Sequence, residues 1–445
     1  MKINFTQNMK RLYLSAIVAL ATIIGVQAQE VDFEEYTLGN GLHVILHQDN
    51  SAPVVVTSVQ YHVGAKNEDP ERTGFAHFFE HLLFEGTENI ERGKWFDIVT
   101  ANGGSNNAYT TDDITYYYEV FPSNSLELGL WMESERLLHP VINQIGVDTQ
   151  NEVVKEEKRL RINNQPYGNL LYAVKKNLFT NHPYRWATIG SMEHLDAATL
   201  EEFIDFKEKF YVPNNAVLVV AGDIDPAKTR KMIDDYFGSI PRGKEVEKIN
   251  IKEAPITKQI DAKHYDPNIQ VPALINAYRT PGMTERDASV LDMISDILSG
   301  GKSSRLYKKM VDENKTALEV AAINLSQEDY GSYITLAIPM GETTLEQLTK
   351  EIDEEIVKIQ TDLISEREHQ MLLNKFENRY VQSNASVEGI ANSLANYYTF
   401  YNDASKINDE LKLYQSITRE EIRDVARKYL NPNQRLRLEY LPKED

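Results

Sequence analysis

The sequence predicts an α+β fold of two homologous domains, each a mostly antiparallel sheet packed with helices. Two observations indicate this architecture. Segments with the two-residue period of strands lie before and between segments with helical periodicity, an order typical of α+β domains. The C-terminal half also repeats a pattern of the N-terminal half: seven of sixteen residues are identical between 199–214 and 418–433, at an offset of 219.

Each copy of this repeat begins with a threonine suited to cap a helix, continues with acidic first-turn residues, and ends in Pro-Asn before a strand. Two unrelated amphipathic helices are the alternative, but chance would rarely preserve the cap, the stop and the following strand together. The offset is close to half of the chain that follows residue 28. We therefore expect domains over 29–245 and 255–445, joined within a charged segment poor in apolar residues, 242–261.

The elements of the first domain follow from local patterns. We expect strands in GLHVILHQ and VVVTSVQYHVG, helices over 74–85 and 92–102, strands in NNAYTTDDI and TYYYEVF, and helices over 124–138 and about 145–162. The second domain opens alike, with a strand in VPALINAYRT and a helix in RDASVLDMISDILS. That helix has no histidine, so the chemistry of the chain is expected in the first domain.

Residues 1–28 have the organisation of a secretory signal peptide. A basic start precedes an apolar stretch from Leu12 to Val26, and a small-residue site ends at Ala28. We expect cleavage there and a periplasmic or secreted mature chain. A membrane anchor is the alternative, but this stretch is shorter than the roughly 20 residues that a span needs. No later stretch is apolar and long enough to span a bilayer.

Composition excludes several classes of site. The chain has no cysteine, which rules out disulfides, thiol nucleophiles and thiolate metal sites. A metal must therefore be bound by histidine, carboxylate or carbonyl groups. The net charge of −20 disfavours binding to nucleic acid.

The segment GFAHFFEHLLFEGT places His77, Glu80 and His81 within an apolar run. On a helix these positions stand at i, i+3 and i+4 and share one face. Two imidazoles one turn apart can bind one divalent cation, and the carboxylate between them can reach a water molecule on that cation. A core helix with hydrogen-bonded histidines is the alternative interpretation.

A catalytic zinc site needs a third ligand and an open position. The other histidines form no second pair at helical spacing on a plausible helix. The segment NEVVKEEKRLR, 151–161, is a better source, since it predicts a helix that carries Glu152, Glu156 and Glu157.

Five segments together resemble the pitrilysin/insulinase family of inverted-motif zinc peptidases. They occur in family order over almost all of the expected mature chain: GFAHFFEHLLFEGT, NNAYTTDDITYYYEVFP, NEVVKEEKR, YVPNNAVLVVAGDID and LSGGKSSRLY. The resemblance is strongest to the half-length branch, which includes the zinc-bearing β-type subunit of the mitochondrial processing peptidase. It implies half of a clamshell fold and one Zn²⁺ per chain.

The resemblance also implies the roles of the site residues. His77, His81 and Glu157 are the expected zinc ligands, and Glu80 is the expected general base. Zinc would lower the pKa of a bound water and polarise the scissile carbonyl, while Glu80 would move the proton to the leaving amine. Glu156 is expected to be a solvated neighbour, because adjacent helical residues point about 100° apart.

The segment NNAYTT resembles the substrate-binding edge strand of the family. An extended peptide can add to such an edge through main-chain hydrogen bonds. The resemblance places Asn107 near the scissile carbonyl, with Ala108 and Tyr109 lining the strand beside it. An ordinary strand with packed tyrosines is the alternative.

The chain departs from the family pattern in two places. Gln150 stands where the family often has a second acid, two helical turns before Glu157. Val311 and Leu318 stand where complete family sites carry an arginine and a tyrosine that hold the substrate. Neither side chain can donate a hydrogen bond, although Arg305 or Tyr307 could replace that pair.

These observations predict an exported zinc metalloendopeptidase subunit that acts on peptides or unfolded protein segments. The alternative is a non-catalytic scaffold member of the same family. The missing pair predicts a heterodimer with a homologous chain that lacks the zinc motif but carries the arginine and the tyrosine. A homodimer is the second choice.

Overall fold

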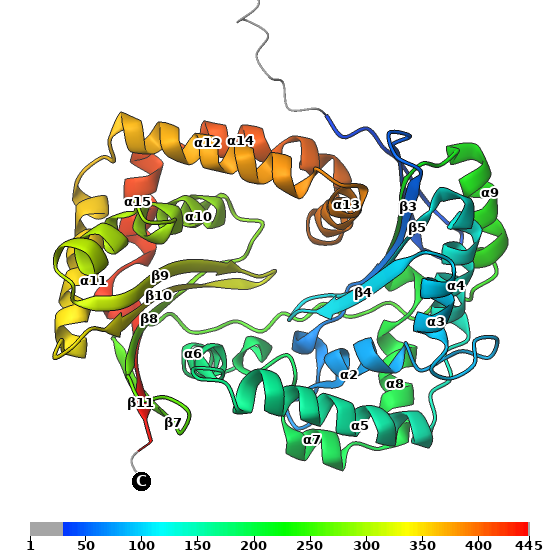
Figure 1. Ribbon diagram of the computed structural model, residues 1–445, viewed down its shortest axis with the longest axis horizontal. Coiled ribbons are helices and arrows are strands. Elements are labelled where there is room, and N and C mark those ends of the chain that lie inside the picture. Colours follow the sequence, from blue (N-terminus) through cyan, green and yellow to red (C-terminus); the bar gives the residue numbers. More distant parts are fainter. Residues whose placement is uncertain (1–29, 444–445) are drawn as a thin grey trace, which may run out of the picture. The chain divides into compact units, whose positions relative to one another are not determined.

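The computed structural model describes residues 30–443 of the chain (Figure 1). The expected signal peptide, residues 1–28, lies outside the described residues. Among the residues that are described, no helix combines the length and apolar character needed to cross a membrane.

The first half contains a six-stranded sheet in the order β1-β2-β6-β3-β5-β4. The β2–β6 pair is parallel and all other pairs are antiparallel. Its strands are β1 (Glu34–Thr37), β2 (His43–Gln48), β3 (Val54–Tyr61), β4 (Ser105–Thr110), β5 (Thr115–Pro122) and β6 (Ala216–Gly222). Its helices are α2 (Phe75–Leu82), α3 (Trp95–Ala101), α4 (Leu126–Leu138), α5 (Gln144–Lys158), α6 (Leu170–Leu178), α7 (Met192–Ala197), α8 (Leu200–Phe210) and α9 (Pro226–Phe237).

The second half contains a five-stranded sheet in the order β7-β11-β8-β10-β9. Only the β7–β11 pair is parallel. Its strands are β7 (Ile260–Asp266), β8 (Ala273–Pro281), β9 (Ala317–Ser326), β10 (Tyr330–Pro339) and β11 (Arg435–Pro442). Its helices are α10 (Arg286–Ser299), α11 (Leu345–Thr361), α12 (Glu366–Ser383), α13 (Val387–Tyr401), α14 (Glu410–Ser416) and α15 (Arg419–Tyr429).

The five strands of the second sheet correspond in order to five strands of the first, and β1 is an additional strand of the first sheet. This correspondence confirms the predicted α+β fold of two similarly built domains. In both sheets the last strand of the half is parallel to the first of its two neighbours and antiparallel to the second. The repeated helices α8 and α15 both begin with a capping box, made by Thr199 with Glu202 and by Thr418 with Glu421. Both are followed by a short 3-10 turn that starts at proline, and then by the corresponding strand, β6 or β11.

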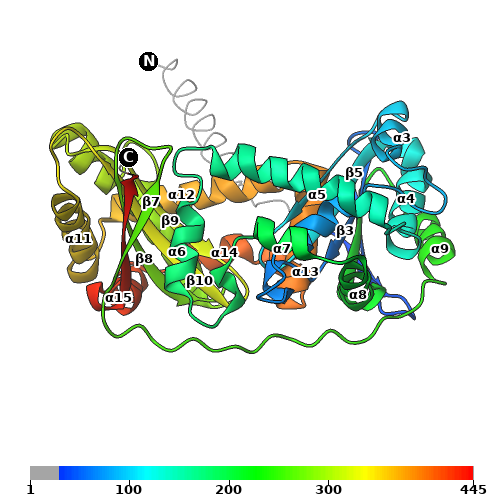
Figure 2. The ribbon, with the colours of Figure 1, turned by 90° about the horizontal axis from the view of Figure 1, so that it is seen from below.

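The expected boundaries at residues 245 and 255 remain a proposal. Both lie in a stretch, 238–259, that has no helix or strand and runs between the halves (Figure 2). This stretch is fixed near its end, because Glu253 Oε1 accepts hydrogen bonds from the backbone N–H groups of Thr180, Asn181 and His182 at 2.6–2.8 Å.

Some predicted elements are shorter in the structure. The expected strand NNAYTTDDI ends at Thr110, because the hydroxyl of Thr111 accepts hydrogen bonds from the N–H groups of Asp113 and Ile114 and closes a turn. The helix expected to end near residue 162 leaves α-helical geometry after Lys158 and continues as a π-helical turn, Arg159–Asn163.

Each sheet has one face covered by helices of its own half and the other face covered by a helix of the other half. In the second half, α13 lies on β3 and β6 of the first sheet, where Tyr398 stacks on His43 at 3.5 Å and Gln60 donates to Thr399 (Figure 1). In the first half, α6 packs on β8 and β11 of the second sheet (Figure 2). The resulting core joins residues such as Val174 and Leu178 to residues such as Ile275, Leu436 and Leu438. The two halves are therefore held together by α13 and α6, each of which packs on the sheet of the other half.

A buried polar cluster forms a second set of contacts between the halves. Lys66 is 7% exposed, and its Nζ lies 3.0 Å from Asp113, 2.5 Å from Glu328 and 3.3 Å from Asp329. Asp113 follows strand β4, whereas Glu328 and Asp329 form the tip of the β9–β10 hairpin. His62 also approaches Glu328 at 2.7 Å. We call these residues the Lys66 cluster.

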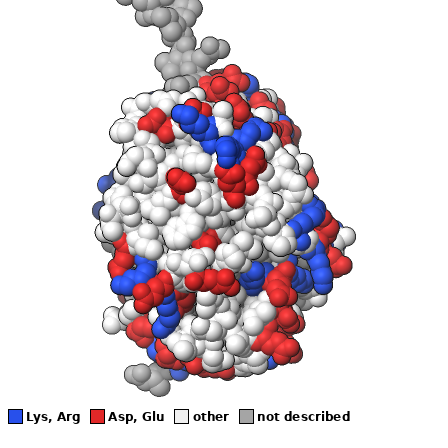
Figure 3. Space-filling model, turned by 90° about the vertical axis from the view of Figure 1, so that its right-hand side faces the viewer, with Lys and Arg blue, Asp and Glu red and all other residues white. Residues whose placement is uncertain are grey.

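The outer surface of the first half shows a different charge arrangement. Acidic and basic side chains lie beside one another on the face drawn in Figure 3. The first half also has exposed ion pairs between neighbours on one helix, such as Lys231 with Asp235 on α9. Exposed pairs of this kind add little to stability.

The Lys66 cluster predicts a large effect of one substitution. Lys66→Met should lower the free energy of unfolding by about 3–5 kcal/mol, because Asp113, Glu328 and Asp329 would be left buried without their shared cation. Chemical denaturation measures this change. The matched control is Lys231→Met in the exposed pair on α9, which should leave the denaturation midpoint nearly unchanged.

The cluster also has a defined pH dependence. Burial opposes ionisation of Glu328, but His62 and Lys66 outweigh it and lower the pKa from 4.5 to about 2. The stability contributed by this carboxylate is therefore fully present above pH 4.5 and is lost as the pH falls towards 2.

A Lys66→Met protein as stable as the wild type at pH 7 would contradict the proposed role of Lys66 as the shared cation of the cluster.

Candidate metal and peptide site

The helix α2 presents His77, Glu80 and His81 because its apolar side is packed against the first-half core. Phe75 stacks on Phe203 of α8 with ring centroids 4.6 Å apart, and Phe78, Phe79 and Leu82 are also buried. The three polar side chains, at i, i+3 and i+4, are left on the opposite face. The sequence prediction of one shared face is confirmed.

The start of α2 is fixed by a buried carboxylate. Glu68 accepts hydrogen bonds from the N–H of Gly74 at 2.8 Å and from the N–H of Ala76 at 2.9 Å. These donors belong to the first turn, where helical N–H groups have no partner within the helix. Gly74 has a left-handed φ of 101°, and a Cβ there would lie 2.8 Å from the carbonyl oxygen of Ile189, so glycine is required.

The end of α2 is fixed by a buried guanidinium. Arg136 of α4 donates from Nη1 to the carbonyl oxygen of Leu83 at 3.2 Å, from Nη2 to Glu119 at 2.9 Å and from Nε to Glu133 at 3.1 Å. Its Cζ also lies 4.1 Å from the ring centroid of Trp95. Burial and the neighbouring Glu133 raise the pKa of Glu119 well above its ordinary value. Protonation of Glu119 would leave Arg136 paired with the single carboxylate charge of Glu133.

The third member of the group comes from α5. Asn143 caps this helix by accepting a hydrogen bond from the N–H of Gly146 at 2.9 Å, and Val147 and Val154 are buried beneath it. Gly146 faces α2, because a Cβ built at this position would lie 3.4 Å from the Leu82 side chain. This packing brings Glu157 over the face of α2 that carries the two histidines.

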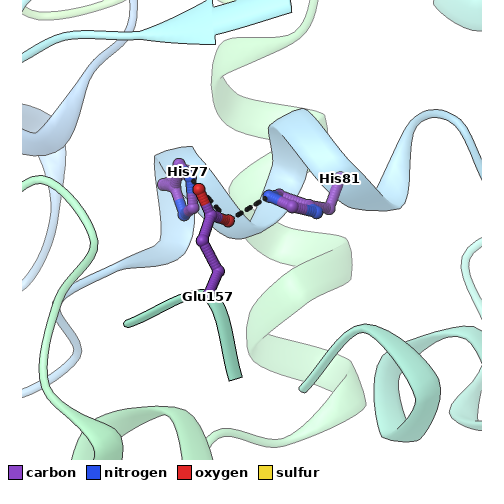
Figure 4. A group of neighbouring side chains, drawn as sticks. All are labelled: His77, His81 and Glu157. Carbon is purple, nitrogen blue, oxygen red and sulfur yellow. Dashed lines mark ion pairs between the residues drawn. The ribbon is translucent and has the colours of Figure 1, made fainter. Parts of the chain in front are cut away.

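His77, His81 and Glu157 converge in the structure (Figure 4). Glu157 Oε2 lies 3.1 Å from His81 Nε2 and 3.6 Å from His77 Nε2. One ligand atom from each residue lies within 4.8 Å of the others, and this is the one such group of three or more metal-binding side chains found among residues 30–443. Glu157 Oε1 is also 2.6 Å from Arg161.

The spacing of these atoms fits a zinc ion. Tetrahedral ligands about 2.0–2.1 Å from zinc lie about 3.3–3.4 Å from one another. The two measured distances bracket that value. Two imidazoles and a carboxylate are also a donor set that zinc sites use when one coordination position stays open. The opposite nitrogen of His77, Nδ1, is buried without a hydrogen-bond partner among the described residues.

The pKa values keep two of these groups in the form that binds a metal. Burial, with the charge of His81 adding to it, lowers the pKa of His77 to about 4, so that its imidazole is neutral at pH 7. The hydrogen bond from His81 lowers the pKa of Glu157, which keeps this carboxylate ionised. Neutral imidazole and ionised carboxylate are the required ligand forms.

Glu80 is held separately from the three converging side chains. The hydroxyl of Thr110, the last residue of β4, donates to Glu80 Oε2 at 2.6 Å. Burial raises the pKa of Glu80, although the hydrogen bond from Thr110 opposes this shift. A carboxylate with a raised pKa is better suited to accept and return a proton near neutral pH.

The neighbours of Glu157 on α5 do not join the group. The side chain of Glu156 is 55% exposed and pairs with Arg159 at 3.1 Å, as expected for a solvated neighbour. Gln150, two turns earlier, donates from Nε2 to Glu85 at 2.6 Å. Glu85 in turn pairs with Arg92. Gln150 stands where the family that the sequence resembles often has a second acid, and in this chain it holds Glu85 in place.

The expected substrate strand is β4, and it forms an edge of the first sheet. The side chains of its three expected contact residues lie in different surroundings. Asn107 is exposed, and its Oδ1 accepts a hydrogen bond from the N–H of Ala108 at 3.0 Å. Ala108 packs against the first-half core. The hydroxyl of Tyr109 accepts a hydrogen bond from Asn392 of α13 at 2.6 Å, which ties this strand to the second half.

The positions of the missing pair lie in the second half. Val311 packs against the second-half core on a π-helical segment, Tyr307–Glu313, and Leu318 is exposed on β9, the edge strand of the second sheet. The suggested replacements are engaged elsewhere. Arg305 makes two hydrogen bonds to Glu368 at 2.9 and 3.1 Å, and Tyr307 packs against the same core as Val311.

A cavity of about 1,170 Å³ opens beside the converging side chains. His77, Glu157 and Thr110 form part of its lining. The rest of the lining comes from residues within 66–73, 158–176 and 180–194, and from Ile249 and Ile251 of the stretch between the halves. Its volume is larger than the roughly 300–1,000 Å³ of most small-molecule pockets, and so it can hold several residues of a peptide.

Three features of the site escaped the sequence analysis. The Thr110–Glu80 hydrogen bond and the cavity join segments that are distant in sequence, and no local pattern indicates them. Arg136 had a weak signal, because Glu133 and Arg136 stand at i and i+3 between apolar residues on both sides, in LWMESERLL. A charged pair in that position is a candidate for burial.

Comparisons with known proteins agree with the fold. The family model described as "Insulinase (Peptidase family M16)" matches residues 43–191, and the one described as "Peptidase M16 inactive domain" matches residues 197–376. The zinc protease PqqE of Helicobacter pylori is 27% identical over 421 residues, which cover 94% of this chain and 95% of that protein.

Solved structures of other proteins have a similar fold. The crystal structure of a protease from Helicobacter pylori has a TM-score of 0.88 at 26% identity and covers 93% of this chain and 100% of that chain. The periplasmic protease PqqL of Escherichia coli shares the fold, with a TM-score of 0.77 at 20% identity. That match covers 93% of this chain but 48% of the PqqL chain, so this chain corresponds to about half of PqqL.

Proposed function

Because this chain belongs to the insulinase (peptidase M16) family, whose similar members include named zinc proteases, we propose that it is a zinc metalloendopeptidase subunit. Its substrates would be peptides or unfolded protein segments. The observation that carries the proposal is the convergence of His77 Nε2, His81 Nε2 and Glu157 Oε2. These three side chains would hold one Zn²⁺.

The zinc ion would supply Lewis acidity, which polarises a carbonyl and lowers the pKa of a water molecule. The chain's own residues supply the remaining functions. Glu80 would accept the proton of the attacking water and deliver it to the nitrogen of the leaving amine. Thr110 would hold the Glu80 carboxylate in place through its hydrogen bond of 2.6 Å.

The edge strand β4 would bind the substrate as an added strand. Main-chain pairing at an edge orients an extended peptide without reading its side chains. Asn107 is exposed at that edge, which suits the proposed contact with the substrate near the scissile carbonyl. Ala108 would take part through its main chain, because its side chain faces the core. Tyr109 would support the strand through its bond to Asn392 rather than through a free hydroxyl.

We also propose that the chain is exported and acts outside the cytoplasm. The signal-peptide pattern of residues 1–28 supports export. The similar fold of PqqL, which is named a periplasmic protease, is in keeping with this location.

A non-catalytic role within the same family is the second candidate. Val311 and Leu318 favour it, since neither side chain can bind a substrate carbonyl. The convergence of two histidines and a glutamate opposes it, because a scaffold does not require these groups to meet. Stoichiometric zinc in the purified protein would separate the two candidates.

The first prediction from this proposal concerns metal binding. His77→Ala, His81→Ala and Glu157→Ala should each abolish stoichiometric zinc, because each removes one of three ligands. Metal analysis of the dialysed protein measures this loss. Zinc should also raise the melting temperature of the wild type and fail to raise that of the three variants. Glu156→Ala, on the same helix, is the matched control and should keep its zinc. Strong zinc loss in that control would mean that the ligand on α5 is misassigned.

The second prediction separates the base from the ligands. Glu80→Gln should keep zinc but lower kcat for peptide hydrolysis roughly 10²- to 10⁴-fold, because it removes the proton acceptor and no ligand. Steady-state hydrolysis of a quenched fluorescent peptide, together with metal analysis of the same sample, measures both effects. Substantial turnover by Glu80→Gln would show that another group is the base.

The third prediction concerns the partner. We propose that the active form is a heterodimer with a homologous chain that lacks the zinc motif and carries the arginine–tyrosine pair. In a homodimer Val311 and Leu318 would face the substrate, and unpaired buried carbonyl groups cost about 1–3 kcal/mol each. That cost corresponds to a loss of roughly 5- to 150-fold. The fold of this chain matches about half of the PqqL chain, which is in keeping with a second half supplied by a partner.

The partner is tested by assaying the purified chain alone and after addition of such a homologue. Activity should rise by at least the lower end of that range when the homologue is added. Full activity of the isolated chain, unchanged by the homologue, would contradict the heterodimer while leaving the zinc site intact.

A further inference from the structure

We propose that the cavity beside the zinc-binding group, called here the basic cavity, binds the carboxylate groups of an acidic peptide segment. Binding of such a peptide does not depend on the proposed function. Only its cleavage after binding rests on that function. It names a substrate class that the peptidase chemistry alone does not specify.

The charge of the cavity is opposite to that of the chain. The whole sequence has 67 acidic and 47 basic residues. The lining of the cavity has two acidic side chains, Glu68 and Glu157, and six basic ones: Lys66, Lys158, Arg161, Lys175, Lys176 and Arg185. An excess of basic groups in an acidic protein marks a place where negative charge is attracted.

Three of the six basic groups are already neutralised. Lys66 belongs to the Lys66 cluster, Lys175 pairs with Asp112 at 2.6 Å, and Arg161 pairs with Glu157. Glu68 does not reduce the remaining charge by ion pairing, since its two oxygens accept N–H groups of α2.

The other three groups have no carboxylate partner among residues 30–443. Lys158 donates to the carbonyl oxygen of Gly190, and Arg185 donates to the carbonyl oxygen of Thr180 at 2.8 Å. Lys176 lies over the ring of Tyr172 with its Nζ 5.8 Å from the centroid. Carbonyl and ring contacts position these cations but leave their charge unbalanced, so an added carboxylate can pair with them.

The position of the cavity relative to β4 identifies the occupant as part of the substrate. His77, Glu157 and Thr110 line it, and Thr110 is the last residue of β4. A peptide paired with β4 that extends past Thr110 therefore enters the basic cavity. Ile162, Leu171, Trp186 and Ile251 add apolar lining, which suits acidic residues spaced among apolar ones.

Binding is tested without hydrolysis by using the Glu80→Gln protein. The probes are fluorescein-labelled peptides of equal length with three Glu, three Gln or three Lys residues, placed in either the N-terminal or the C-terminal half. Each is made with a free and an amidated C-terminus. Fluorescence anisotropy should show that a Glu peptide binds more tightly than its Gln counterpart in one of the two placements, and the Lys peptide least tightly. A preference for the free over the amidated form would identify the C-terminal carboxylate as the bound group.

The variant that tests the cavity is Lys176→Gln/Arg185→Gln, because both positions are exposed and neither side chain belongs to the zinc group. It should reduce the preference for the Glu peptide about 2- to 25-fold. The control Lys302→Gln/Arg367→Gln changes the charge equally at exposed second-half positions outside this cavity and should leave the preference unchanged. Lys176→Glu/Arg185→Glu should reverse the preference in favour of the Lys peptide.

The results separate this inference from the proposed function. Equal affinity for Glu and Gln peptides, or the same loss in the control and cavity variants, would overturn the inference even if the protein hydrolyses peptides. An acid preference that the cavity variant removes would support it even if hydrolysis were absent. If the double variant does not fold, the single variants Lys176→Gln and Arg185→Gln replace it, and a preference unchanged in both would count against the inference.

Discussion

The candidate site depends on the buried guanidinium of Arg136. Its donors reach the carbonyl of Leu83 just after α2 ends, Glu119 on β5 and Glu133 on α4, so one residue fixes the helix, the sheet and the covering helix to one another. Removing either partner of such a buried group leaves an uncompensated charge, which costs about 3–5 kcal/mol. With its start fixed by Glu68 and its end by Arg136, α2 has a defined place on the sheet. Its two histidines then meet a glutamate from α5 with little freedom to move apart.

The two halves stabilise each other by exchanging coverage of their sheets. A sheet with one bare apolar face is not stable in water, and each sheet here obtains its second cover from the other half, from α13 in one case and from α6 in the other. The Lys66 cluster joins the same two halves at the turn that follows β4. The second half therefore contacts both the edge strand and the turn after it. Asn392 donates a hydrogen bond to Tyr109 on β4, and the β9–β10 hairpin is bonded to the turn that follows. Strand β4 can remain at an edge and still be rigid.

Much of the fold and part of the site could be predicted because the signals were local. The repeat carried its caps, its Pro-Asn stops and its strands within sixteen residues, and both copies fold as expected. His77, Glu80 and His81 share a helical face by spacing alone. Glu157 was different: its helix also offers Glu152 and Glu156, and only the family resemblance selected among them. The exchanged helices could not be predicted, because periodicity shows that a helix has an apolar face but not which sheet covers it. Lys66 and Arg136 escaped for a related reason, since their partners are distant in sequence.

The comparison of α2 with α10 explains why one half carries the chemistry. Helix α2 follows β3 along the chain and packs on β4 and β5, and α10 follows β8 and packs mainly on β9. Helix α10 buries Leu291, Met293 and Ile294 and has no histidine, so its half forms an ordinary apolar core. Helix α2 instead leaves two imidazoles and a carboxylate partly buried, which is unfavourable unless each finds a partner. His77 Nδ1 lacks one among the described residues, and burial shifts the pKa values of His77 and Glu80 away from their charged forms. A site held in this way needs support from outside itself, and the second half supplies that support through α13 and the Lys66 cluster. The half without a metal-binding group is therefore part of the site in a mechanical sense, because it holds the strand and the turn that border the group.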